Sequence, residues 1–213
     1  MSGRVVDMDR LIAEAEMLLA SGERKFLAMA GAPGSGKSTT AESLFEQLAS
    51  RHPGKVAILP MDGFHYDDAL LHEMGRRPWK GAPDTFDVGG LRSILHRLAS
   101  GEEQNVAVPV FDRELEISRG SARLISDEAR LIIVEGNYIL LDEAPWDRLA
   151  DCFDLTVMID VPEAELRRRL RVRWEGYGLS EAEIDHKLDG NDLPNGRVVI
   201  QKSRPAELVY RSI

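Results

Sequence analysis

Short apolar runs alternate with amphipathic segments along most of this chain. Apolar runs of strand length, typical of buried parallel strands, predict strands over residues 25–30, 56–61, 131–134, 155–161 and 207–210. Apolar spacing of three and four residues predicts helices over residues 11–19, from a glycine-rich turn to about 49, 91–98, 163–174 and after Pro194. Strands that alternate with helices predict an α/β fold, in which a parallel sheet carries helices on both faces. Because ligands bind at the carboxyl ends of the strands in such folds, the candidate chemistry is expected there.

The same pattern shows no internal repeat, linker or low-complexity stretch, which favours one domain over residues 1–213. Residues from about 163 to 190 are predicted to form a small helical lid within that domain. No run approaches the roughly 18 apolar residues that span a bilayer, and the N-terminus lacks the apolar core of a signal peptide. We therefore expect a cytoplasmic protein with no membrane insertion, and we leave a homodimer open.

Composition narrows the class of protein. The chain has 213 residues, 43% of them hydrophobic, and its 27 basic and 36 acidic side chains give a net charge of −9. That balance is typical of a globular protein and argues against a nucleic-acid partner, but it allows a local site for a small anion. The single cysteine, Cys152, excludes an intramolecular disulfide and a cysteine-based zinc site. Its apolar neighbours predict a buried structural thiol.

A phosphate-binding loop follows the first of these predicted strands. Residues 31–38 match the pattern G-x-x-x-x-G-K-[ST] and lie between a strand and a helix, as the motif requires. Glycines let the backbone wrap around phosphates, and the N–H groups at the helix start attract the anion. Lys37 would reach the β- and γ-phosphates, and Ser38 would hold Mg²⁺. The predicted nucleoside triphosphate site comprises Gly31, Ala32, Pro33, Gly34, Ser35, Gly36, Lys37, Ser38 and Thr39.

An acidic residue follows each of two further predicted strands. Asp62 follows the strand over 56–61, and Glu135 follows the strand over 131–134. Both would face the phosphate loop along the carboxyl edge of the sheet, where a carboxylate could accept a proton from an attacking hydroxyl or help to hold the metal. A turn or a helix cap is the alternative for each acid. We take Ser38, Asp62 and Glu135 as candidate metal ligands and leave open which acid is the base.

Five arginines crowd the helix predicted over 163–174, at positions 167, 168, 169, 171 and 173. Arg169 and Arg173 are four residues apart and share a face. As part of a closing lid they could screen the charge of a transferred phosphoryl group, while Leu166, Leu170 and Trp174 anchor the opposite side. A solvated face paired with nearby glutamates is the alternative. We favour the lid, because a phosphoryl-transfer site must exclude water.

Taken in order, these motifs resemble one superfamily of P-loop kinases. The phosphate loop is followed by Asp62-Gly-Phe-His65, by Lys80-Gly-Ala-Pro-Asp-Thr-Phe-Asp87, by Phe111-Asp-Arg113 and by Val134-Glu-Gly-Asn137. This order is seen in the group of uridine kinase, phosphoribulokinase and bacterial pantothenate kinase. The chain is most similar to the branch known as putative fructose transport system kinases, a group similar to nucleoside and nucleotide kinases. The resemblance spans about residues 25–211 and implies a three-layer P-loop NTPase fold that uses ATP and Mg²⁺.

The resemblance also implies roles for individual residues. Asp62 matches the base for the acceptor hydroxyl, and Glu135 matches the acid near the metal and the substrate. Asn195 matches a position close to the adenine. The acceptor site implied in this way comprises Asp62, His65, Tyr66, Lys80, Asp87, Arg113 and Glu135. The Phe-Asp-Arg sequence at 111–113 departs from the Tyr-Asp or Tyr-Ser of relatives, so the identity of the acceptor stays open.

The leading prediction is an enzyme that transfers the γ-phosphoryl group of ATP to a hydroxyl of a small metabolite. Its predicted catalytic groups are Asp62, Lys37, Glu135, Arg169 and Arg173. The resemblance implies a sugar such as fructose as the acceptor, and a nucleoside or pantothenate-like compound is the alternative. A regulatory or transport-associated ATPase would share the phosphate loop but would need no acceptor pocket. A GTPase is disfavoured because the chain has no N-K-x-D guanine signature.

Overall fold

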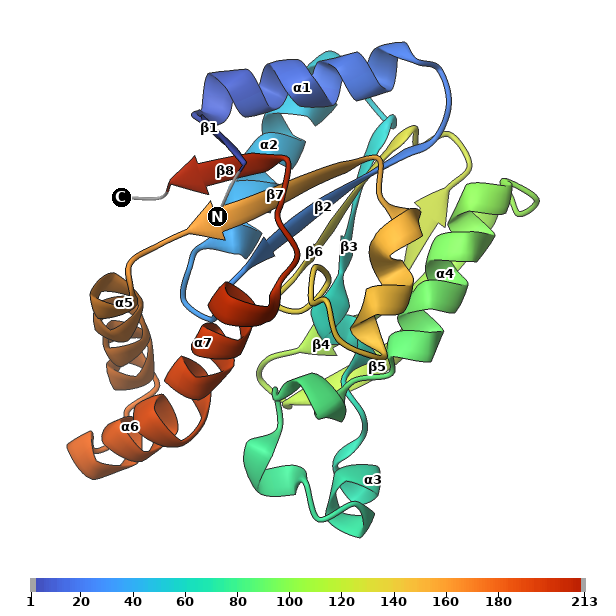
Figure 1. Cartoon of the computed structure of the whole chain (residues 1–213). Helices are drawn as coiled ribbons and strands as arrows, with labels where there is room; N and C mark the ends of the chain where they lie inside the picture. The colour runs from blue at the N-terminus through green and yellow to red at the C-terminus, as the bar shows by residue number, and fades with distance from the viewer. Residues whose placement is uncertain (1–2, 212–213) are drawn as a thin grey trace.

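A six-stranded parallel sheet forms the centre of the protein in the computed structural model, which describes residues 3–211 (Figure 1). The strands lie in the order β1-β8-β7-β2-β6-β3. Their bounds are β1 Arg4–Val6, β2 Lys25–Gly31, β3 Val56–Pro60, β6 Leu131–Gly136, β7 Leu155–Asp160 and β8 Leu208–Arg211. All five predicted strands are present, and β1 adds an edge strand that pairs with β8. The prediction of a parallel α/β sheet is confirmed.

Helices cover both faces of this sheet, which makes three layers (Figure 1). Within the described residues the α-helices are α1 Met8–Ala20, α2 Lys37–Arg51, α3 Asp68–Glu73, α4 Val88–Ser100, α5 Glu163–Gly176, α6 Glu181–Lys187 and α7 Leu193–Lys202, of which α3 and α6 project away from the sheet (Figure 1). Side chains alternate along β2, so Leu27 and Met29 join the core formed with α1 and α2, whereas Ala28 and Ala30 join the core formed with α4. Because both faces of the central strands are covered, these strands appear in the sequence as continuous apolar runs.

An antiparallel hairpin of β4 Asn105–Asp112 and β5 Ile117–Ser126 packs against the turn that follows β3. No strand was predicted here, because β5 is mostly polar and exposed and so lacks an apolar run. Of the hairpin residues, only Val106, Val108 and Ile125 belong to the buried core. A Cβ on Gly63 would lie 2.5 Å from the carbonyl oxygen of Pro109, so the hairpin approaches the turn more closely than a side chain would allow. The tip of the hairpin thereby comes next to Asp62.

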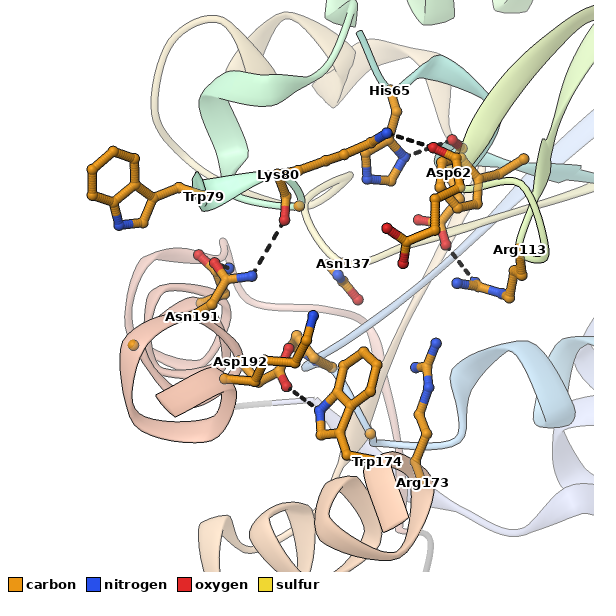
Figure 2. A pocket seen from close by; sticks show the side chains of 18 of the residues that line it. Asp62, His65, Trp79, Lys80, Arg113, Asn137, Arg173, Trp174, Asn191 and Asp192 are labelled. Carbon is orange, nitrogen blue, oxygen red and sulfur yellow. Dashed lines mark hydrogen bonds and ion pairs between the residues drawn. The ribbon is translucent and has the colours of Figure 1, made fainter. Parts of the chain in front are cut away.

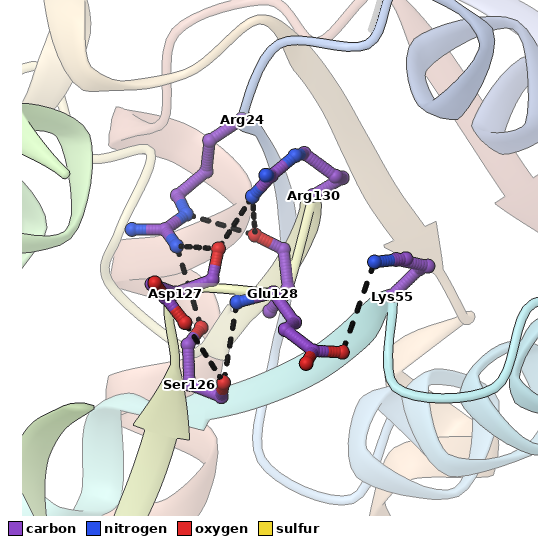
Figure 3. Close-up of polar contacts among 7 residues, drawn as sticks. Arg24, Lys55, Ser126, Asp127, Glu128 and Arg130 are labelled. Atoms are coloured by element: carbon purple, nitrogen blue, oxygen red, sulfur yellow. Dashed lines mark hydrogen bonds and ion pairs between the residues drawn. The ribbon is translucent and has the colours of Figure 1, made fainter. Parts of the chain in front are cut away.

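Arg24, just before β2, ties the loop after the hairpin to the main sheet (Figure 3). Its guanidinium donates hydrogen bonds to the backbone carbonyls of Ala129 at 2.9 Å, Asp127 at 2.8 Å and Ser126 at 3.3 Å. Arg130 donates to the carbonyl of Asp127 as well. These bonds satisfy carbonyls of the turn that leads into β6, and so help to fix the strand that carries the second candidate acid.

Cys152 is half-buried rather than fully buried and packs against the core on the α4 side. Burial raises the pKa of its thiol, which agrees with a structural role. Within residues 3–211 no helix combines the length and the apolar character needed to cross a membrane.

Candidate active site

The phosphate loop connects the end of β2 to the first turn of α2. Gly36 is the N-terminal cap of α2 with a φ of +85°, a conformation that glycine adopts without strain. No side chain among residues 3–211 caps the first N–H groups of α2, so they are available to a phosphate. Within the loop the hydroxyl of Ser35 is buried and has no hydrogen-bond partner in the described chain. The uncapped helix start and this hydroxyl both suit a nucleotide phosphate.

Helix α5 packs directly on this loop. Gly34 has a φ of +78°, and a Cβ there would lie 2.8 Å from Cγ of Leu170 in α5. Arg169, on the same helix, donates a hydrogen bond of 3.1 Å to the carbonyl of Ser35 and one of 2.7 Å to the carboxylate of Glu165. The position of the loop therefore depends on a helix more than 120 residues further along the chain.

Glu135 lies in β6, beside β2 and close to the loop. Its Oε2 accepts a hydrogen bond of 3.0 Å from the hydroxyl of Ser38. Burial raises the pKa of Glu135 above its ordinary value, and the positive charge of Lys37 offsets only part of that effect. In residues 3–211 no three His, Cys, Asp or Glu side chains gather to hold a metal ion by themselves. A hydroxyl and one carboxylate nevertheless suit Mg²⁺ when nucleotide phosphates supply further ligands.

Asp62 lies in a short 3-10 turn, Met61–Phe64, that follows β3. Its Oδ2 accepts a hydrogen bond of 2.6 Å from Nη2 of Arg113, at the tip of the hairpin. Burial by itself would raise the pKa of Asp62, but the charges of Lys37 and Arg113 and the hydrogen bond from Arg113 outweigh it and hold the pKa below its ordinary value. Asp62 is therefore ionised at neutral pH.

A cavity of about 480 Å³ lies between the phosphate loop, the Asp62 turn, the hairpin tip and the helices α5 to α7 (Figure 2). Its size is that of a pocket for a small molecule. The lining residues are Pro33, Gly34, Lys37, Asp62, His65, Arg77, Pro78, Trp79, Lys80, Gly81, Phe86, Phe111, Arg113, Glu116, Asn137, Arg173, Trp174, His186, Lys187, Gly190, Asn191, Asp192 and Asn195. We call the lining residues from 62 to 137 the acceptor side, and those from 173 to 195 the lid side.

His65 is firmly held on the acceptor side. Its ring centre lies 4.0 Å from that of Phe86 and 4.6 Å from that of Phe111. Its Nδ1 donates a hydrogen bond of 2.7 Å to the backbone carbonyl of Asp62. Burial lowers the pKa of His65, although the negative charge of Asp62 opposes this. The ring is therefore neutral at pH 7, and it supports the turn that carries Asp62.

Lys80 reaches the acceptor side from the segment after α3. Its side chain is only 9% exposed, and its Nζ lies 2.6 Å from Oδ1 of Asp68. The same amine donates a hydrogen bond of 2.5 Å to the carbonyl of Glu116 in the hairpin, and Arg77 pairs with the Asp68 carboxylate at 2.7 Å. Contacts from two separate segments thus determine where Lys80 lies.

Arg173 and Trp174 bring the end of α5 to the lid side of the cavity (Figure 2). Nε1 of Trp174 donates a hydrogen bond of 2.7 Å to Oδ2 of Asp192, and Nζ of Lys187 lies 4.5 Å from the centre of a Trp174 ring. Burial raises the pKa of Asp192, and the bond from Trp174 offsets part of this. Asp192 ends a π-helical turn, Leu188–Asp192, a distortion that is frequent at functional sites.

The arginines of α5 do not all take part in the cavity. Four of them form ion pairs with acidic side chains. Arg168 and Arg169 both pair with Glu165, Arg167 pairs with Asp189, and Arg171 pairs with Asp185. The solvated, ion-paired face that was the alternative thus describes most of this helix. Of the five arginines only Arg173 lines the cavity, and Arg169, expected beside it, instead contacts the backbone of the loop.

Three residues predicted for the acceptor site, Tyr66, Asp87 and Glu135, lie outside the cavity lining, and Glu135 contacts Ser38 instead. Asp87 caps α4 by accepting a hydrogen bond of 2.8 Å from the N–H of Gly90, because an aspartate before a helix meets its free N–H groups. Tyr66 donates its backbone N–H to the carbonyl of Thr85. The predicted residues that do line the cavity are Pro33, Gly34, Lys37, Asp62, His65, Lys80, Arg113, Arg173 and Asn195.

Asn195 is part of a chain of hydrogen bonds across the cavity. Its amide donates to Oδ1 of Asn191 at 2.9 Å, and the amide of Asn191 donates to the carbonyl of Lys80 at 3.2 Å. These bonds join the lid side to the acceptor side. The contact of Asn195 with adenine stays a prediction.

Several lining residues were not predicted as part of the site. Asn137 follows Glu135 and Gly136 at the carboxyl end of β6, and that position was the available signal. Its Oδ1 is buried without a hydrogen-bond partner in the described chain. Trp174 packs partly against the core, as its spacing from Leu170 predicted, but it also lines the cavity.

Known proteins are similar to this chain in both sequence and fold. The model of the phosphoribulokinase/uridine kinase family matches residues 26–175. The uncharacterized protein YggC of Escherichia coli (strain K12) is 38% identical over 179 residues, which cover 83% of this chain and 73% of that protein. The "putative uridine kinase C227.14" of Schizosaccharomyces pombe is 31% identical over 219 residues, 98% of this chain and 92% of that protein.

A crystal structure described as a "putative fructose transport system kinase" from Silicibacter sp. TM1040 superimposes with a TM-score of 0.85. It is 37% identical, and the match covers 93% of this chain and 98% of that one. The phosphate loop, the two strand-end acids and these similarities agree with one another. The chain belongs to the phosphoribulokinase/uridine kinase family, and it is a P-loop kinase that transfers a phosphoryl group to a hydroxyl acceptor.

Proposed function

We propose that this protein transfers the γ-phosphoryl group of ATP, in the presence of Mg²⁺, to a hydroxyl group of a small polar metabolite. One observation carries the proposal: the ionised carboxylate of Asp62 and the amine of Lys37 line the same cavity beside the phosphate loop. Phosphoryl transfer to a hydroxyl needs a base for the acceptor and cationic groups for the phosphates. This cavity offers both.

The loop and the acid beside it would hold ATP and Mg²⁺. The free N–H groups at the start of α2 and the buried hydroxyl of Ser35 suit phosphate oxygens, and Lys37 neutralises their charge. We assign Mg²⁺ to Ser38 and Glu135, which already share a hydrogen bond of 3.0 Å. When bound, Mg²⁺ stabilises charge on the phosphate oxygens. This assignment leaves Asp62 free to serve as the base.

Asp62 would accept the proton of the acceptor hydroxyl. Its lowered pKa keeps it ionised, and His65 holds its backbone carbonyl in place. Arg173 would face the transferred group from the lid side and screen its charge. Arg169 acts as a positioning residue, since it donates a hydrogen bond to the carbonyl of Ser35 in the phosphate loop.

We propose a sugar as the acceptor, with fructose as the first candidate, and a nucleoside or pantothenate-like compound as the alternative. The acceptor side combines polar groups such as His65 and Arg113 with the aromatic rings of Trp79 and Phe111, a lining that suits a ligand rich in hydroxyl groups. The description of the Silicibacter relative as a fructose transport system kinase favours the sugar. The name of the Schizosaccharomyces pombe relative favours the nucleoside.

The variant Asp62→Asn tests the assignment of the base. It is expected to bind ATP as the wild type does and to lose phosphoryl transfer by about 10²- to 10⁴-fold. ADP release is followed with sugars, nucleosides and pantothenate, and the product is identified by mass spectrometry. Asp84→Asn is the matched control, because Asp84 is an exposed acid of the same region that pairs with Arg76 outside the cavity lining.

Two outcomes would contradict parts of this proposal. Near-normal transfer by Asp62→Asn would exclude Asp62 as the base. ADP release that no acceptor stimulates would favour a regulatory or transport-associated ATPase, which needs no acceptor site.

A further inference from the structure

We infer that the acceptor carries its own anionic group, a carboxylate or a phosphate, and that Arg113 binds this group in place of Asp62. This inference rests on the function proposed above and narrows the acceptor to a hydroxyl compound with a negative charge. Among sugars it favours a sugar phosphate or a sugar acid over fructose itself, and it is compatible with a pantothenate-like acceptor.

Arg113 reaches the cavity from the tip of the hairpin, between β4 and β5 (Figure 2). Oδ1 of Asp112 accepts hydrogen bonds of 3.2 Å from the N–H groups of Glu114 and Leu115, which order the backbone of the tip. The side chain of Arg113 is 50% exposed, whereas that of Asp62 is 17% exposed. Arg113 therefore lies at the open edge of the pair, where its long side chain can change partner by rotation about its own bonds.

The ion pair with Arg113 engages the carboxylate of Asp62, which the reaction needs as its base. Nη2 of Arg113 lies 2.6 Å from Oδ2 of Asp62, so this carboxylate oxygen already accepts a strong hydrogen bond. To take up the proton of the acceptor, Asp62 has to accept a hydrogen bond from the acceptor hydroxyl instead. A carboxylate neutralised by a guanidinium is also a weaker base. Transfer therefore requires that Asp62 and Arg113 separate, at least in part.

The other two cations of the acceptor side, Lys80 and Arg77, already have a partner. Lys80 pairs with Asp68 at 2.6 Å, and Arg77 pairs with the same carboxylate at 2.7 Å. Nζ of Lys80 and the guanidinium carbon of Arg113 lie 5.5 Å and 5.7 Å from the centre of the Phe111 ring, so two cations converge on one wall of the cavity. Once Asp62 turns to the hydroxyl, a neutral acceptor would leave Arg113 without the carboxylate that it now contacts. An anionic group on the acceptor restores the balance.

The γ-phosphate of ATP is the other anion that could draw Arg113 from Asp62. We favour the acceptor because Lys37 and Arg173 already offer cations from the loop and the lid side, while Arg113 shares its wall with Lys80 and Phe111. An anion on the acceptor and the γ-phosphate of ATP predict different kinetics for a variant that lacks the Arg113 charge. If Arg113 binds the acceptor, loss of its charge lowers kcat/KM for charged acceptors alone. If Arg113 binds the γ-phosphate, the same loss lowers kcat/KM for every acceptor.

Matched pairs of acceptors test the inference on the full chain. Each pair shares a hydroxyl-bearing skeleton with and without a charge: fructose and fructose 6-phosphate, sorbitol and gluconate, pantothenol and pantothenate, uridine and uridine monophosphate. ADP release gives kcat/KM for wild type, Arg113→Gln and the control Arg119→Gln, whose residue pairs with Asp112 outside the cavity lining. The wild type and the control are expected to prefer a charged member. Arg113→Gln should lower kcat/KM for that member by roughly 10- to 100-fold, through KM, and leave the neutral member nearly unchanged.

The other results separate this inference from the proposed function. Preference of the wild type for neutral members would overturn the anionic acceptor and leave the kinase proposal standing. An equal loss for both members in Arg113→Gln would assign Arg113 to the γ-phosphate and would also overturn it. ADP release that no acceptor stimulates would contradict the proposed function itself.

A binding titration tests the inference even if none of the matched compounds is the acceptor. The loop is saturated with a non-hydrolysable ATP analogue and Mg²⁺, inorganic phosphate is added, and tryptophan fluorescence is followed, since Trp79 and Trp174 line the cavity. Wild type and Arg119→Gln are expected to bind phosphate saturably, and Arg113→Gln at least about tenfold more weakly. Equal binding by all three proteins would overturn the inference.

Discussion

The hydroxyl of Ser38 donates a hydrogen bond of 3.0 Å to the carboxylate of Glu135, although the two residues are 97 positions apart in the chain. They meet because β6 pairs in parallel with β2, so that Glu135 lies opposite Met29 just before the phosphate loop. The bond joins the start of α2 to the end of a central strand. It brings a carboxylate to the hydroxyl that we assign, together with it, to Mg²⁺.

Glu135→Gln should weaken the use of Mg²⁺ more than the binding of metal-free ATP. The amide keeps the shape of the carboxylate and can accept the bond from Ser38, but it lacks the charge that attracts the cation. We expect the Mg²⁺ concentration for half-maximal ADP release to rise by about tenfold or more. Glu163→Gln is the control, because Glu163 pairs with Arg197 outside the cavity lining. An unchanged Mg²⁺ requirement would exclude Glu135 as a metal ligand.

The same substitution should stabilise the fold at neutral pH. Burial raises the pKa of Glu135 above its ordinary value of 4.5, so the folded state holds the proton more tightly than the unfolded chain. The cost of ionising Glu135 is therefore absent below the unfolded pKa and complete above the folded pKa. The Tm of Glu135→Gln is expected to exceed that of the wild type at pH 7 and to converge with it as the pH falls toward 4. Thermal unfolding followed by circular dichroism measures both, and a lower Tm for the variant at pH 7 would show that the carboxylate stabilises the fold.

Gly34→Ala should abolish nucleotide binding, because its new methyl group would meet Leu170 of α5 and displace the loop. A Cβ at position 34 would lie 2.8 Å from Cγ of Leu170, and the φ there is +78°. Gly22→Ala is the matched control, since Gly22 has a φ of +75° and nothing within 4 Å of a Cβ. Both variants should lose about 1–2 kcal/mol of stability through the strained backbone. Calorimetric titration with ATP should show lost binding in Gly34→Ala alone, and normal binding by that variant would mean that the loop does not depend on its contact with α5.

Trp174→Phe should loosen the lid side while leaving its apolar contacts. The phenylalanine ring cannot donate to Asp192, so a largely buried carboxylate loses a bond of 2.7 Å, at a cost of about 1–3 kcal/mol. Because Arg173 adjoins Trp174, we also expect kcat to fall on the order of 10-fold. Thermal unfolding and ADP release at saturating ATP measure the two effects. Tyr177→Phe is the control, as Tyr177 is exposed and its ring centre lies 5.7 Å from that of Trp174; an equal effect in both variants would argue against a specific role for the bond.

The central strands were predictable because their signal is local. The run over 131–134 is apolar throughout, since helices cover both faces of the sheet. The β4–β5 hairpin was missed for the opposite reason. Leu124 of β5 is 65% exposed and Ile125 alone of that strand enters the core, so backbone pairing rather than apolar burial stabilises the strand. Such pairing leaves little trace in the pattern of side chains.

Asp87 shows where prediction of the site reaches its limit. An aspartate just before a helix suits an acceptor contact and an N-terminal cap equally well, and only its bond to Gly90 distinguishes the two. The arginines of α5 show the same limit. Helical spacing puts Arg169 and Arg173 on one face, but α5 packs on the loop at Arg169 and borders the cavity at Arg173. The direction in which a helix crosses its neighbours is not encoded in that spacing.

The sequence by itself determined the parallel α/β fold, the phosphate loop and the acids at two strand ends, because apolar runs and glycine spacing act locally and parallel strands end at one edge. Only the tertiary structure decided which partner each acid contacts there. Glu135 meets Ser38, and Asp62 meets Arg113 from a hairpin 51 residues further along the chain. These pairings depend on strand order and on the approach of a mostly polar hairpin, which arise from long-range packing and leave no periodic signal in the chain.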